Sequence, residues 1–114
     1  MLVQDILNDA RLLFNDSIVP YRWSDAELIG WLIDALQELW DRRRTAFFVA
    51  GIVTAIPAAI AAVGDTVLVQ DAYKKPLAHY LAYVAFLENT DDVSNVNLSQ
   101  KHYDAFMKGS GIHG

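Results

Sequence analysis

Three histidines are the residues of this chain best suited to proton transfer or metal binding: His79, His102 and His113. A metal site on a helix often places a second ligand one helical turn from the first. None of the three has a histidine or a carboxylate three or four positions further along the chain. We therefore interpret His79 as a packed residue at an interface, and we expect no metal and no cofactor.

Motifs typical of catalysis are missing from the sequence. It contains no Gly-rich phosphate loop, no HExxH or GxSxG motif, and no cysteine for a thiolate site or a disulfide. Asp91 and Asp92 are adjacent, which favours a solvated acidic loop over a catalytic pair. We therefore predict that the protein is not an enzyme.

The run Arg42–Arg44 is the most concentrated charge in the chain, and it has three interpretations. The first is that these cations stabilise the negative end of a helix. The second is that they contact acidic groups on a partner subunit. The third, nucleic-acid binding, is the weakest, because the net charge of −5 is the opposite of a basic footprint.

The stretch Tyr21–Arg44 must position these arginines, and its sequence predicts a long helix. Ser24 and Glu27 have the spacing of a capping box, in which each side chain bonds the other residue's amide. Trp23 and Leu28 have the spacing of a hydrophobic staple. The helix start is therefore well defined by the sequence.

The faces of this helix indicate that it has more than one neighbour. Its polar residues share one narrow arc, and the apolar arc covers roughly 200°, whereas a surface helix needs about 100° to meet its own core. We expect the surplus to be covered by another subunit, with Trp31, at the border of the polar arc, as the best candidate contact among the tryptophans.

Three further helices are expected, over residues 2–15, 71–89 and 95–108, because their apolar residues recur at helical spacing. Pro76 fits the first turn of the main body of its helix, and Gly109 fits a C-terminal cap. The 71–89 helix carries His79, Tyr83 and Phe86 opposite its core stripe, where charges are usual, so we expect these residues at an interface.

The segment 46–63 is apolar over a length that could span a membrane, and three arginines precede it. Pro57 would break such a helix, and the amphipathic flanks favour a soluble interpretation. In that interpretation Phe47–Thr54 and Thr66–Gln70 are short strands of a hairpin, and Ala58–Val63 forms one helical turn.

Together these elements predict a mainly α protein: a bundle of about four helices with a short β-hairpin or extended arm in the middle. With 114 residues, we expect one domain over residues 1–109, with its β element near 47–70, and a flexible tail at 110–114. Apolar residues make up 54% of the chain, more than a small domain hides easily, so oligomerisation is expected.

The segment YRWSDAELIGWLIDALQEL resembles the signature of the small adaptor, or head–tail connector, proteins of tailed bacteriophages. In that family an RW-[ST/P]-DAEL helix start precedes a long helix that ends near an arginine-rich or proline turn. Two later segments resemble further family signatures, and the residues that match them are Tyr73, Leu77, Tyr80, Asp91, His102, Tyr103 and Phe106. The chain departs from the family in its more apolar 46–70 region and in the missing proline turn.

The resemblance implies a structural subunit of the virion neck, made in the host bacterial cytoplasm. It implies a ring of identical copies, a dodecamer, which docks on the portal protein, meets a downstream tail or neck protein, and passes the genome without sequence-specific binding. The resemblance implies no contact with a membrane. The expected interface residues are Trp31, Arg42, Arg43, Arg44, Phe47, Phe48, Val49, Ile52, His79, Tyr83 and Phe86.

Two alternatives stay open at this point. One is a small holin-like membrane protein anchored by residues 46–63, which would fractionate with membranes. The other is a helical regulatory or DNA-binding module, which would shift DNA in a salt-dependent way.

Overall fold

The computed structural model describes residues 1–14, 22–49, 52–53, 60, 62–88 and 93–111, and it is mainly helical. Its helices are α1 (Val3–Leu13), α2 (Asp25–Arg42), α3 (Lys74–Leu87) and α4 (Val93–Gly109). Short 3-10 turns, η1 (Arg44–Phe47) and η2 (Asp71–Tyr73), follow α2 and precede α3. The predicted mainly α fold with four helices is confirmed.

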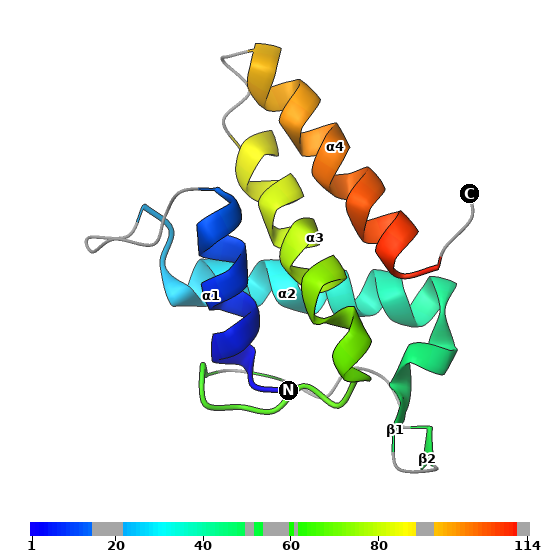
Figure 1. The fold of residues 1–114 in the computed structure, drawn as a ribbon. Helices are drawn as coiled ribbons and strands as arrows, with labels where there is room; N and C mark the ends of the chain where they lie inside the picture. The colour runs from blue at the N-terminus through cyan, green and yellow to red at the C-terminus, as the bar shows by residue number, and fades with distance from the viewer. Residues whose placement is uncertain (15–21, 50–51, 54–59, 61, 89–92, 112–114) are drawn as a thin grey trace.

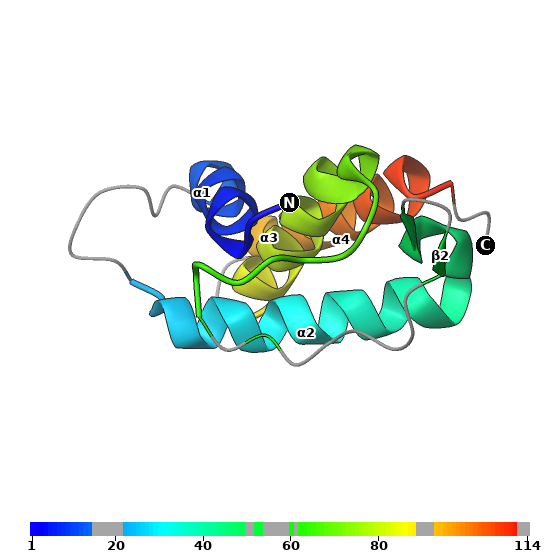
Figure 2. The same ribbon diagram turned by 90° about the horizontal axis from the view of Figure 1, so that it is seen from below.

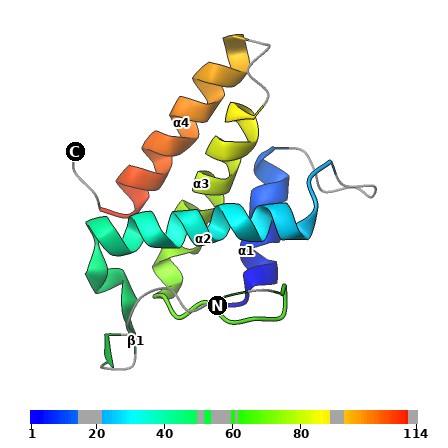
Figure 3. The same ribbon diagram turned by 180° about the vertical axis from the view of Figure 1, so that it is seen from behind.

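The helices form two layers (Figures 1 and 2). α1, α3 and α4 lie in one layer, with α3 between the other two, and α3 and α4 run antiparallel. α2 crosses the back of this layer, as the view from behind shows most clearly (Figure 3). α3 is therefore the central element, and it packs against all three other helices.

The start of α2 has the predicted capping box. The Glu27 amide donates to Ser24 Oγ at 3.2 Å, and the Ser24 amide donates to Glu27 Oε1 at 3.4 Å. These bonds satisfy two backbone donors that the first turn of a helix would otherwise leave free. Trp23 lies edge-on to Trp31, with ring centres 5.2 Å apart.

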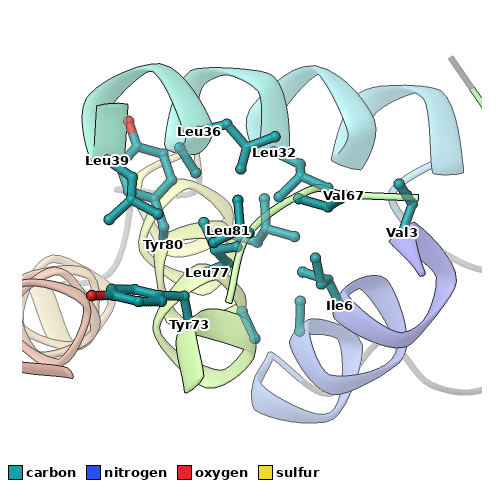
Figure 4. Packing of buried hydrophobic residues seen from close by; sticks show 14 of the residues in the cluster. Val3, Ile6, Leu32, Leu36, Leu39, Val67, Tyr73, Leu77, Tyr80 and Leu81 are labelled. Atoms are coloured by element: carbon teal, nitrogen blue, oxygen red, sulfur yellow. The ribbon is translucent and has the colours of Figure 1, made fainter. Parts of the chain in front are cut away.

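The buried stripe of α2 is narrower than its apolar arc. Leucine, isoleucine and alanine residues at helical spacing face the other layer and form the core with α1 and α3 (Figure 4). By contrast, Ile33 is 40% exposed, and Trp31 and Trp40 are only partly buried. The core residues contributed by α2 are Leu28, Ile29, Leu32, Ala35, Leu36 and Leu39.

The predicted hairpin between 47–54 and 66–70 is wrong. The extended segment at 66–70 bonds instead to the chain start and to η1: the Val67 amide donates to Met1 O at 2.8 Å, and the Gln70 amide donates to Ala46 O at 3.0 Å. Val67 and Val69 point into the core, which fixes this segment against the helices. The burial of Val67 and Val69 therefore determines which backbone groups this segment bonds to.

A much smaller ladder lies within the first of the two predicted strands. β1 (Phe48–Val49) pairs antiparallel with β2 (Ile52–Val53), which is two residues on each side. A ladder of this size is marginal without packing against other elements. Three residues of the predicted helical turn at 58–63, namely 58, 59 and 61, lie outside the described residues, so this prediction is not tested. Within the part of the chain that is described, no helix has the length and apolarity needed to cross a bilayer.

The start of the expected C-terminal tail is fixed in place. Ser110 is 1% exposed, its amide donates to Phe106 O at 3.0 Å, and the Gly111 amide donates to Lys108 O at 3.1 Å. The left-handed residue here is Gly111, with φ of 69°, two positions beyond the predicted cap at Gly109. The prediction of a loose tail is therefore wrong for 110 and 111, and 112–114 lie outside the described residues.

Candidate functional site

The seam between α3 and α4 brings together His79 and His102. Their Nδ1 atoms lie 2.8 Å apart, which is a hydrogen-bond distance. The ring of Phe86 stacks on His102, with centres 5.5 Å apart and planes within 3° of parallel. Three ring side chains, two of them predicted interface residues, thus form one continuous cluster on this seam.

Both imidazoles are held in the neutral form at neutral pH. Burial lowers the pKa of His79 below its ordinary value, and the nearby Lys75 ammonium lowers it further. Burial, then His79 and then Lys101 lower the pKa of His102 in the same way. A neutral imidazole has one N–H and one free nitrogen, so the pair forms a single N–H···N hydrogen bond.

Tyr83 belongs to a second group, which links the seam to α2. Its ring lies 4.9 Å from that of Tyr103, whose hydroxyl donates to Glu38 Oε1 at 2.6 Å. The same carboxylate oxygen lies 3.2 Å from Arg42 Nε. This hydrogen bond to Glu38, followed by burial, raises the pKa of Tyr103 to about 12.

The arginine run at the end of α2 has intramolecular partners. Arg42 pairs with Glu38, and Arg43 Nε donates to the hydroxyl of Tyr73 at 3.0 Å. The guanidinium of Arg44 lies over the Trp40 ring, 5.0 Å from its centre. All three arginines are nevertheless exposed. They therefore stabilise this end of α2 and also face solvent, where a partner could meet them.

Phe47 and Phe48 are neighbours in sequence but lie in opposite environments. Phe47 is 2% exposed and packs edge-on against Trp40, with ring centres 5.2 Å apart. Its assignment to an intersubunit contact is therefore corrected: it is a core residue, because η1 turns it inward. Phe48 is 48% exposed and borders a surface hollow of about 240 Å³ that Arg44, Thr45 and Gln70 also line.

The remaining predicted residues are only partly accounted for. Val49 and Ile52 pair through their backbones, and their side chains lie outside what the structure describes. Trp31 is partly buried against Trp23, whose ring in turn lies beneath the Arg22 guanidinium at 5.0 Å. The predicted residues thus lie in three places: near the start of α2, around η1 and β1, and along the α3–α4 seam.

The histidine pair was missed at the sequence level because its partners are 23 positions apart on different helices. A search within one helix cannot detect a contact that forms only when two helices pack. The signal in the sequence was indirect: both histidines lie in apolar helix faces. Among the residues that the structure describes, no group of three or more histidine and carboxylate side chains could hold a metal ion.

Comparisons with models of protein families, with curated proteins and with solved structures find no match to this chain.

Proposed function

We propose that this protein is a structural subunit of the neck of a tailed bacteriophage, which forms a ring between the portal and the tail. The proposal rests first on the resemblance of YRWSDAELIGWLIDALQEL to the connector signature. In this role the protein performs no reaction. The ring extends the portal channel and presents a new surface to the next tail component.

The structural observation that carries the proposal is that large apolar side chains are exposed at two separate ends; Leu12 on α1 and Ile33 on α2 are exposed as well. A ring needs two different, complementary surfaces on each subunit, because its contacts are heterologous. At one end, Leu2, Phe48 and Leu68 are each between 45% and 49% exposed. Leu68 lies in the segment 66–70, which holds the other two residues nearby. Thr66 at its start forms a bridge with Leu2, and the side chain of Gln70 at its end donates to Phe48 O.

The other end is the tip where α3 finishes and α4 begins (Figure 1). Leu87 is the last residue of α3, and Val96 and Leu98 lie in the first two turns of α4. These three side chains are between 36% and 45% exposed. Two separate apolar groups favour head-to-tail association over a two-fold dimer, in which one surface meets itself.

Charge supports the part of the proposal that concerns DNA. A passing genome must slide through the channel without being held, and an acidic lining repels phosphates. The net charge of −5 is consistent with such a lining. A ring structure with lysine and arginine rings facing the channel would contradict this part of the proposal.

The test is association with the portal protein of the same phage, measured by light scattering. We expect a complex at micromolar concentrations, and the purified chain alone to be a monomer that assembles on the portal. Phe48→Ser should weaken this complex, while Leu12→Ser, at an exposed leucine outside both apolar groups, is the matched control. A lack of binding at micromolar concentration, or virions that lack the chain in electron micrographs, would overturn the proposal.

A further inference from the structure

The facing nitrogens of His79 and His102 can share one proton but cannot hold two. The ring centres lie 5.1 Å apart and the ring planes are within 28° of parallel. The distance between the ring centres exceeds the 2.8 Å between the Nδ1 atoms by about the width of one ring. Each nitrogen lies about half a ring width from its own ring centre, so both nitrogens must lie on the line that joins the two centres. The N–H of one Nδ1 and the lone pair of the other therefore face each other, whereas two ligands of one metal ion would converge on a point beside that line.

The charged groups of the described residues that act on the pair, Lys75 and Lys101, oppose its protonation. Lys75 on α3 acts on His79, and Lys101 on α4 acts on His102, so each helix contributes a cation. Of the described residues that bear on these two histidines, none is a carboxylate that would stabilise an imidazolium. Phe86 covers one face of His102 and limits its contact with water. The two histidines must therefore titrate as a coupled pair, in two separate steps.

We propose that the contact between His79 and His102 is an acid-sensitive latch that holds α4 against α3. The first proton binds Nε2 of the imidazole that donates, and the N–H···N bond survives as a charge-assisted bond. The second proton binds the accepting Nδ1. Two N–H groups then face each other across the seam, and the rings must separate.

The direction of the pH dependence follows from the lowered pKa values. A histidine whose pKa is lower in the folded protein stabilises the fold fully above its ordinary value of 6.5. That stabilisation is lost as the pH falls below 6.5 and through the lowered values. Because the pair joins α3 to α4, the loss is local: α4 loosens while the packing of α1 against α3 is unchanged.

Imidazole nitrogen NMR tests the geometry on the wild-type chain. At about pH 7.5 we expect one of the two Nδ1 atoms to carry a proton and the other to be bare. Lowering the pH should give two steps for the pair, both below the ordinary value. Equal protonation of both Nδ1 atoms at neutral pH, or two independent transitions at or above the ordinary value, would overturn the latch.

Hydrogen exchange tests whether α4 loosens at acid pH. Between about pH 7.5 and about pH 4.5, the ratio of α4 to α1 amide exchange rates should rise about tenfold or more. The double variant His79→Gln/His102→Gln should change this ratio less than about twofold over the same range. His113→Gln removes the third histidine and should behave like the wild type. A ratio that stays constant in the wild type contradicts the proposal, whether or not the double variant folds.

Discussion

The ring of Pro76, in the first turn of α3, fills the space beside Gly109 where a side chain would begin. A Cβ at Gly109 would lie 2.8 Å from Pro76 Cγ, which is closer than such atoms approach in proteins. By contrast, a Cβ at Gly30, on the exposed face of α2, would meet nothing within 4 Å. The absence of a side chain at Gly109 therefore allows the end of α4 to pack against the start of α3.

This contact predicts opposite effects for two glycine substitutions. Gly109→Ala should lower the free energy of unfolding by about 1–2 kcal/mol, because overpacking outweighs the gain in helix propensity. Gly30→Ala should raise it by about 0.5–1 kcal/mol. Urea denaturation measures both. Adding Pro76→Ala should recover part of the loss in Gly109→Ala, and equal effects of the two alanines would contradict the contact.

Arg11 and Asp25 form the ion pair that joins α1 to the start of α2. Their side chains meet at 2.7 Å, and the side chain of Arg11 is only 3% exposed. Asp25→Asn removes the negative charge from one partner of a buried guanidinium, which keeps its bond to Trp23 O, so the free energy of unfolding should fall by about 1–3 kcal/mol. Asp34→Asn, on the exposed face of the same helix, should change it by less than about 0.5 kcal/mol. Equal losses in the two variants would exclude a stabilising role for the pair.

Substitutions of Phe47 and Phe48 should have different effects: the first on the stability of the fold, the second on assembly. Phe47→Ala should cost about 3–5 kcal/mol of unfolding free energy, because it empties a buried site. Phe48→Ala should cost less than about 1 kcal/mol, because the ring is half exposed. Under the proposed function, Phe48→Ala should also weaken association with the portal. Thermal unfolding and light scattering on the same preparations distinguish the two effects.

Glu38 predicts an alkaline pH effect through Tyr103. The pKa of Tyr103 is raised from 10.0 to about 12, so its hydrogen bond stabilises the fold below pH 10 and is lost as the pH rises through about 12. Glu38→Gln should lower this pKa towards 10 and reduce the loss of stability over that range. Ultraviolet titration of tyrosinate, compared with Tyr103→Phe for assignment, measures the shift. Asp41→Asn, also on α2, should leave the pKa of Tyr103 unchanged.

The helices and the cap of α2 could be predicted because their determinants are local. Ser24 and Glu27 are three positions apart, and the apolar spacing along each helix is visible in the sequence. By contrast, neither the pairing of 66–70 nor the contact between His79 and His102 could be predicted, because each joins segments that are distant in the chain. Phe47 shows the same limit: β propensity favoured a strand, whereas burial against Trp40 required a turn.

The distances along the chain over which these contacts form also indicate an order of folding. α3 and α4 are consecutive antiparallel helices, so their packing closes only a short loop. The bond from the Val67 amide to Met1 O, by contrast, joins residues on either side of α1, α2 and η1. Closing that longer loop costs more chain entropy before any contact compensates for it, so we expect the α3–α4 hairpin to form early and the 66–70 segment to pair with the chain start late.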